Sequence, residues 1–194
     1  MTTLAVWTPD DGLLGVVAPL ALAVARRSAT LVVDLDESGP RYPGDGSLAD
    51  LVADGPRRPD LEPGPQRGTA VLRNGGVSAN PAASVLRALA GGWPDCVVRL
   101  PARRDEAVAT LLQQMRVPVV TVISGLSLDM WPDRLPPGAP AVTQAAGRSG
   151  AAWRPGPVLP KPATGCWDAL LRGRVRPGDR WVRAWVPVWD YPWT

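Results

Sequence analysis

The residues that could do chemistry gather near the N-terminus. An apolar run leads into a turn that contains Gly12 and Gly15, and a later apolar run ends in the carboxylates Asp34 and Asp36. A glycine turn that opens a helix can present backbone N–H groups to phosphate. Carboxylates are ligands that magnesium prefers. The pattern therefore makes nucleotide chemistry the first hypothesis.

Composition excludes catalysis that depends on histidine. The 194 residues include no histidine, so neither a Ser-His-Asp nor a Cys-His arrangement can exist. Cys96 and Cys166 lie far apart without a C-x-x-C motif, which indicates neither a disulfide framework nor a metal site. We predict that Cys96 is a small buried core residue. The net charge is only +3 and the arginines are scattered, so nucleic acid is not a favoured partner.

The elements that would position these groups alternate between strand and helix. The run Leu4 to Trp7, a helix beginning near Leu13 and the run Leu31 to Val33 form a βαβ unit. Further along, the pattern predicts a short helix capped by Ser47, a strand at 69–73, a helix at 80–90 capped by Asn80, a strand at 95–101, a helix at 103–115 and strands at 117–123 and 140–144. The alternation predicts an α/β fold in three layers, with a mostly parallel sheet and helices on both faces.

The βαβ unit, together with GSLADL at Gly46 to Leu51, resembles the ParA/MinD group of deviant P-loop ATPases. In that group a strand leads into K-G-G-V-G-K-T, a helix follows, and the second strand ends in D-x-D before a GSLA-like segment. The resemblance covers about the first two thirds of the chain. The resemblance implies a P-loop NTPase fold. Within the group, the chain is most similar to septum-site-determining proteins and to the CpaE/TadZ-like proteins of pilus-assembly loci.

The chain departs from that group at the P-loop itself. Aligned on K-G-G-V-G-K-T, it keeps Gly12 and Gly15 but has Asp11, Val16 and Val17 in place of the deviant lysine, the phosphate-binding lysine and the magnesium-binding hydroxyl. A P-loop needs the lysine to bind phosphates and the hydroxyl to hold the metal. The resemblance therefore implies a degenerate P-loop.

A second motif of the family is altered as well. DCVVRLP, at Asp95 to Pro101, resembles the family strand that ends in D-t-P, and the register places Arg99 where that aspartate holds the water or the metal shell. In the family, Ser124 and Gly125 would border the nucleotide base. We therefore expect a pseudo-ATPase without enzymatic activity, without a metal and without a cofactor.

Alternatives remain open at this point. The protein could be an atypical nucleotide sensor or ATPase that gathers ATP and magnesium with Asp34, Asp36 or Asp45. It could be a DNA-binding partition-type protein that uses arginine patches. Two glycines three residues apart are also compatible with an ordinary Rossmann-like domain of no P-loop ancestry.

The C-terminal part differs in composition from the rest. We divide the chain into a ParA/MinD-like domain at 1–144 and a Pro/Gly-rich linker with a tryptophan-rich extension at 145–194. Because Pro187 and Pro192 interrupt a helix, we predict a strand in WVRAWVPVWDYPW. Its large rings either pack on the domain or form an interaction surface made of Trp181, Arg183, Trp185, Trp189 and Trp193.

These expectations favour a bacterial protein that acts by binding. The hypothesis is a ParA/MinD-like regulator or scaffold in cell division, positioning or pilus and secretion assembly. A protein partner is favoured over a membrane surface, because the tail offers few basic residues to anionic lipid. A homo- or heterodimer is left open. No apolar run approaches the length of a bilayer span, so we expect a cytoplasmic protein.

Overall fold

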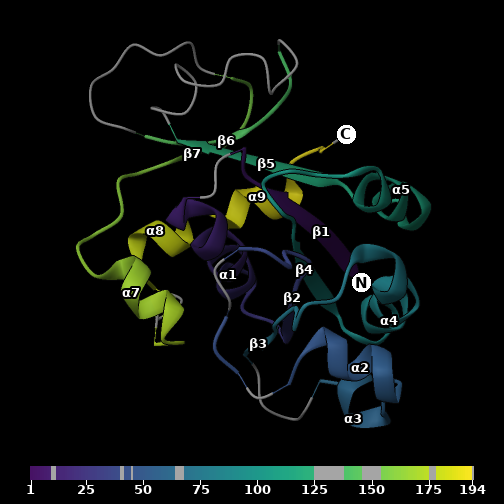
Figure 1. Cartoon of the computed structure of the whole chain (residues 1–194). Coiled ribbons are helices and arrows are strands. Elements are labelled where there is room, and N and C mark those ends of the chain that lie inside the picture. Colours follow the sequence, from purple (N-terminus) through teal and green to yellow (C-terminus); the bar gives the residue numbers. More distant parts are fainter. Residues whose placement is uncertain are drawn as a thin grey trace.

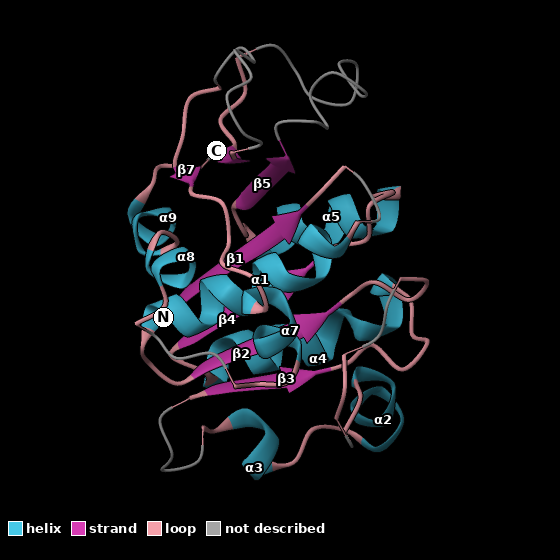
Figure 2. Ribbon diagram, turned by 90° about the vertical axis from the view of Figure 1, so that its left-hand side faces the viewer, coloured by secondary structure: helices cyan, strands magenta, loops and turns pink. Residues whose placement is uncertain are grey.

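A parallel β-sheet of seven strands runs through the structure, and helices cover both of its faces (Figure 1, Figure 2). The computed structural model describes residues 1–9, 12–39, 42–44, 46–63, 68–124, 138–145, 154–174 and 178–193. The strands are β1 (Thr2–Trp7), β2 (Thr30–Asp34), β3 (Thr69–Leu72), β4 (Asp95–Arg99), β5 (Val119–Ser124), β6 (Val142–Gln144) and β7 (Val158–Leu159). Their order is β3-β2-β4-β1-β5-β6-β7, and every pairing is parallel. The predicted three-layer α/β architecture is confirmed.

The helices form one layer on each face of the sheet. One layer holds α1 (Leu13–Arg26), α7 (Cys166–Leu171), α8 (Arg180–Arg183) and α9 (Val186–Asp190). The other holds α4 (Ala79–Gly92) and α5 (Glu106–Met115), with α2 (Leu48–Asp54) and α3 (Arg58–Leu61) beside α4. Side chains alternate along each strand, so that Leu4 and Val6 of β1 face α1 while Ala5 faces the opposite layer.

Helix α1 is covered on two sides. Every residue from Val16 to Ala23 is buried, which leaves no face of this stretch for water. A helix that is apolar all round must be surrounded by other elements. The sheet covers one side of α1, and α7, α8 and α9 cover the other. The C-terminal stretch therefore completes the core around this helix.

Side-chain caps fix where several helices begin. Ser47 caps α2 as predicted: its hydroxyl accepts from the Asp50 N–H at 3.2 Å, and the Asp50 carboxylate accepts from the Ser47 N–H at 2.9 Å. Asp105 caps α5, because its carboxylate accepts from the Val108 N–H at 2.8 Å. This helix therefore begins at Glu106, later than expected.

The predicted start of α4 is wrong by two residues. Ser78, not Asn80, is its N-cap, and the helix already includes Ala79. Pro81 then lies in the first turn, where a missing N–H has no intrahelical acceptor to lose. The helix also continues through Gly91 and ends at Gly92.

The prediction of a strand in the tryptophan-rich tail is wrong. Residues 180–183 and 186–190 form two short helices, α8 and α9, with Ala184 and Trp185 between them. Pro187 falls in the first turn of α9, where proline is tolerated, so it starts a second helix instead of breaking one. The Asp179 carboxylate accepts from the N–H groups of Trp181 and Val182 and so caps α8.

The predicted division at residue 144 stays a prediction. Beyond it, β7 pairs with β6, and residues of α7, α8 and α9 share one core with α1. Cys96 is buried at 1% exposure, as predicted. None of the described helices has the length and apolarity that crossing a bilayer would require.

Candidate functional site

Three of the predicted site residues meet at the carboxyl edge of the sheet. Asp34 ends β2 and Arg99 ends β4, and these two residues are paired in register between the neighbouring strands. Asp36 follows two residues after Asp34. Because parallel strands end at the same edge, the D-x-D carboxylates and the altered second motif come together in space. This edge, outside the carboxyl ends of the strands, is where open α/β sheets bind ligands.

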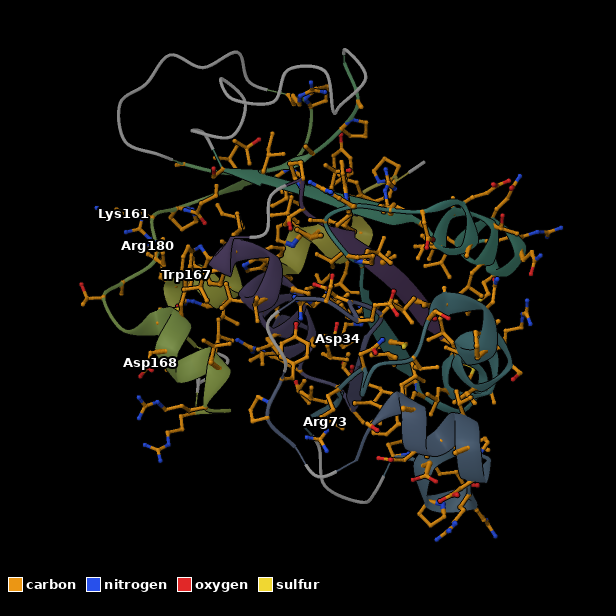
Figure 3. The ribbon with its side chains drawn as sticks, viewed as in Figure 1. Asp34, Arg73, Lys161, Trp167, Asp168 and Arg180 are labelled. Carbon is orange, nitrogen blue, oxygen red and sulfur yellow. The ribbon has the colours of Figure 1, made fainter. Side chains whose placement is uncertain are left out.

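The Arg99 guanidinium forms ion pairs with both carboxylates. One of its nitrogens lies 3.1 Å from Oδ2 of Asp34, and another lies 2.7 Å from Oδ2 of Asp36. All three side chains are buried, with Arg99 only 3% exposed. Two such charge-assisted contacts from one planar group hold the carboxylates in fixed positions. Figure 3 shows Asp34 in the interior of the molecule, beside α1.

Asp36 is fully engaged by its surroundings. Its Oδ1 accepts from the N–H of Gly39 at 2.8 Å, and from the N–H and hydroxyl of Ser38 at 3.2 and 3.3 Å. With Arg99 on Oδ2, these contacts match the roughly four acceptor sites of a carboxylate. A Cβ atom at Gly39 would overlap the Asp36 carboxylate, so this tight turn requires glycine.

Tyr42 completes the cluster and was not predicted from the sequence. Its ring lies 5.3 Å from the Arg99 guanidinium, and its hydroxyl donates to the Val16 carbonyl at 2.7 Å. Burial raises the pKa of the Tyr42 hydroxyl, so it remains a neutral donor. It ties the loop after β2 to the first turns of α1. The only hint in the sequence is a lone aromatic residue in a Pro/Gly-rich loop.

Asp34 differs from an ordinary surface aspartate in its acidity. Burial raises the pKa of Asp34 to about 6, while Arg99 and the Asp36 N–H, which donates to Oδ1 at 3.0 Å, oppose the rise. The cost of desolvating the charge is therefore only partly offset by the ion pair. Near pH 6 this carboxyl exchanges a proton, and the charge of the cluster changes.

The glycine turn lies beside this cluster at the start of α1. Gly12 is the N-cap of α1 and gives no side-chain hydrogen bond to the first turn, and the Gly15 N–H donates to the Gly12 carbonyl at 3.0 Å. Val16 and Val17 are 3% and 0% exposed and belong to the core. Asp11 lies outside the described residues. The N–H groups of the first turn could still donate to a phosphate oxygen, but the valine side chains could not.

A magnesium ion does not fit the described residues of this edge. The Asp34 and Asp36 carboxylates are held by Arg99, so a metal would have to displace a buried guanidinium. No group of three or more potential ligand side chains occurs within the part of the chain that the structure describes. Asp45 and Gly125 lie outside that part, and Ser124 ends β5 at the same edge.

The tryptophans of the tail are buried within the chain. Trp181, Trp185, Trp189 and Trp193 are at most 9% exposed and belong to the core around α1. The Trp181 indole donates to Oε1 of Gln144 at 2.7 Å, and the Trp189 indole donates to the Leu22 carbonyl at 3.0 Å. Of the expected interaction surface, only Arg183 is exposed. The four tryptophan rings instead pack on the domain, which was the alternative expected from the sequence.

Solved structures show which proteins share this fold. A ParA family ATPase from Chlorobium tepidum matches with a TM-score of 0.63 at 12% identity, covering 98% of each chain. The septum site-determining protein MinD from Pyrococcus horikoshii, complexed with Mg-ADP, matches with a TM-score of 0.59 at 13% identity, covering 97% of this chain and 95% of MinD. A variant of McdA from Cyanothece in complex with ATP matches with a TM-score of 0.58 at 12% identity, covering 98% of this chain and 95% of McdA. No family model and no curated protein matches the chain.

The chain therefore has a ParA/MinD-like fold, as the resemblance implied. Two other expectations are wrong. We expected no enzymatic activity and no cofactor, but one of these structures is that of a ParA family ATPase, and the MinD and McdA structures hold Mg-ADP and ATP.

Proposed function

We propose that this chain is a ParA/MinD-like regulator that binds a nucleotide at the carboxyl edge of its sheet without magnesium and acts by docking a protein partner. Cell division, intracellular positioning and pilus or secretion assembly are the processes that such a role suits. The observation that carries the proposal is the buried Arg99 between Asp34 and Asp36. It places a fixed positive charge where a metal would otherwise be needed to balance the carboxylates.

The start of α1 supports the nucleotide part of this proposal. Its first turn has no side-chain cap among the described residues, and a helix of 14 residues directs its N–H groups and positive dipole end toward the same edge. The Asp34 and Asp36 charges oppose a phosphate, but Arg99 offsets one of them. Weak binding, with preference for few phosphates, follows from this balance.

Thermal unfolding with nucleotides tests the nucleotide part. ATP and ADP at about 100 times Kd should stabilise the protein by about 2.7 kcal/mol through mass action. The shift should be the same in magnesium and in EDTA, and adenosine alone should give a smaller one. A shift seen only with magnesium would refute the role given to Arg99. The absence of any shift with either nucleotide would refute nucleotide binding.

The exposed side of the tail supports the partner part. Arg180, Arg183 and Val186 are exposed on α8 and α9, and Val186 is 44% exposed. Arginine beside an exposed apolar residue is a common composition for a binding surface. Arg183→Glu with Val186→Asp should abolish recovery of a partner after cross-linking in cells, while Arg87→Glu on α4 should not. Equal recovery with both variants would place the partner elsewhere.

A further inference from the structure

An open pocket of about 1010 Å³ lies between α1, the edge strand β3 and α7. It follows the C-terminal half of α1, from Leu20 to Arg27, and Tyr42 forms part of its wall. Its size is at the upper end of the range found for small-molecule sites. The proposed nucleotide site does not account for it, because none of Gly12, Asp34 and Arg99 lines it.

Aliphatic side chains from three elements line the pocket. Leu20 and Val24 come from α1, Val71 comes from β3, and Leu170 and Leu171 come from α7. The backbone N–H and C=O groups of the two helices are largely used within the helices. A hydrocarbon needs no hydrogen bonds, whereas an inserted peptide could pair only along the edge strand β3 and would leave its other amide groups unpaired. The wall is therefore better suited to an alkyl chain than to a peptide.

Two arginines provide charge in this pocket. Arg27 caps the C-terminus of α1 and Arg172 caps that of α7, and no aspartate or glutamate is among the described residues that line the pocket. Arg172 is paired with Asp168 at 3.0 Å on the exposed side of α7. The Arg27 guanidinium has no ion pair within the described ranges. A negatively charged group would find its counter-charge at Arg27.

We propose that this pocket binds a single-chain anionic amphiphile, with its alkyl chain against Leu20, Val24 and Leu170 and its carboxylate or phosphate at Arg27. This site goes beyond the proposed function and does not depend on it. Each added methylene of the chain should tighten binding about fourfold, the equivalent of about 0.8 kcal/mol of hydrocarbon burial. Tyr42 links the pocket to Arg99, so the ligand would also contact the wall of the ion-paired cluster.

Calorimetric titration of the whole chain tests the ligand class. Octanoate, decanoate and dodecanoate, each below its micelle concentration, should bind with one site and with affinity rising along the series. Dodecyl phosphate should bind like dodecanoate, and dodecyltrimethylammonium should bind at least about tenfold more weakly. Equal affinity for the cationic and anionic probes, or no rise with chain length, would overturn the proposal.

Two matched pairs of variants locate the site. Arg27→Asn should weaken dodecanoate about tenfold, while Arg116→Asn should leave it unchanged. Both arginines are left-handed helix caps, with φ of 58° and 54°, and asparagine tolerates that conformation. Gly68→Leu should block the pocket, since a Cβ there meets no atom within 4 Å, and Gly91→Leu on α4 is its control. Unchanged binding in a folded Gly68→Leu protein would refute the assignment.

Vesicles distinguish a free amphiphile from a lipid surface. Phosphatidylglycerol vesicles should bind the protein weakly. Arg27→Asn should reduce this vesicle binding no more than other arginine variants do. Binding to vesicles that exceeds binding to dodecanoate, with equal losses at Arg27 and Arg116, would replace the pocket with general attraction to a membrane. The nucleotide shifts described above would be unaffected by any of these outcomes.

Discussion

The guanidinium of Arg99 forms ion pairs with two buried carboxylates. Among single residues, we therefore expect its replacement to reduce stability most. Replacing it with methionine removes the counter-charge that Asp34 and Asp36 share in the interior. Breaking a buried ion pair by removing one partner costs about 3–5 kcal/mol. Urea unfolding of Arg99→Met should show this loss. Arg116→Met, at an exposed position, should change stability by less than about 0.5 kcal/mol; equal effects would show that the ion pairs do not stabilise the fold.

Asp34 should give the stability of the protein a specific pH dependence. Its folded pKa of about 6 is above the ordinary value of an unfolded aspartate, so the folded state keeps the proton over the interval between them. The contribution is present below about pH 4 and is lost as pH rises through 6. The difference in unfolding free energy is on the order of 3 kcal/mol.

Asp34→Asn should remove this component of the pH dependence, because asparagine does not titrate. Chemical unfolding of both proteins at pH 4, 5, 6 and 7 measures it as the difference between the two profiles. Asp36 and Arg99 are present in both proteins, so their contributions largely cancel. Parallel profiles across this interval would contradict a raised pKa at Asp34.

Residue type and position explain why some of these groups could be found from the sequence. Asp34 and Arg99 end apolar runs, and the ends of neighbouring parallel strands must lie at one edge. The sequence could not show that Arg99 forms ion pairs with the carboxylates, because neither apolar run determines the register between the two strands. Tyr42 was missed because it belongs to an irregular loop, where no periodicity indicates what a side chain contacts.

At the scale of single elements, two tryptophans of the tail should respond differently to the same substitution. The Trp181 indole donates to Gln144, whereas the Trp185 indole has no partner among the described residues. Trp181→Phe leaves the buried Gln144 oxygen short of a donor, which costs about 1–3 kcal/mol beyond the lost volume. Trp185→Phe loses volume alone. Urea unfolding should therefore rank Trp181→Phe as the less stable protein, and the reverse order would show that the hydrogen bond between Trp181 and Gln144 does not stabilise the fold.

The last turn of α4 offers a second comparison between neighbours. A Cβ at Gly91 meets no atom within 4 Å, but a Cβ at Gly92 would overlap the carbonyl of Leu61 at the end of α3. Gly91→Ala should stabilise the protein by about 0.5–1 kcal/mol, because alanine is the better helix former. Gly92→Ala should destabilise it by about 1–3 kcal/mol through overpacking. Thermal unfolding of the two variants measures both effects. Stabilisation by both substitutions would show that α3 can move away from residue 92.

The helices of the tail show where local patterns fail. Pro187 argues against a helix interior, yet it occupies the first turn of a new helix after a two-residue break at Ala184 and Trp185. Trp181 and Trp185 are four residues apart, and their rings pack edge to face with centroids 5.5 Å apart. The four-residue spacing was therefore the correct signal. Two short helices can follow it where one long helix cannot.

At the scale of the whole molecule, the C-terminal stretch behaves as part of the domain core. Motif resemblance covers about the first two thirds of the chain, but the shared fold continues through β6, β7 and the last helices. The fully apolar sequence of α1 already required a cover on its outer side. Which segment would supply that cover could not be read from the sequence, because burial of the tail depends on contacts made across more than a hundred residues.

Removal of the tail should therefore unfold the protein. A chain that ends at Arg174 lacks Trp181, Trp185 and Trp189, which cover α1. Losing even two large buried aromatics costs about 6–10 kcal/mol, comparable to the whole stability of an ordinary domain. Circular dichroism and size-exclusion chromatography should show loss of cooperative unfolding and aggregation. A chain that ends at Asp190 keeps these three rings and loses only the contacts of residues 191–194, so it should unfold cooperatively at a lower Tm. A cooperatively folded monomer from the shorter chain would mean that α1 can be covered without its C-terminal helices.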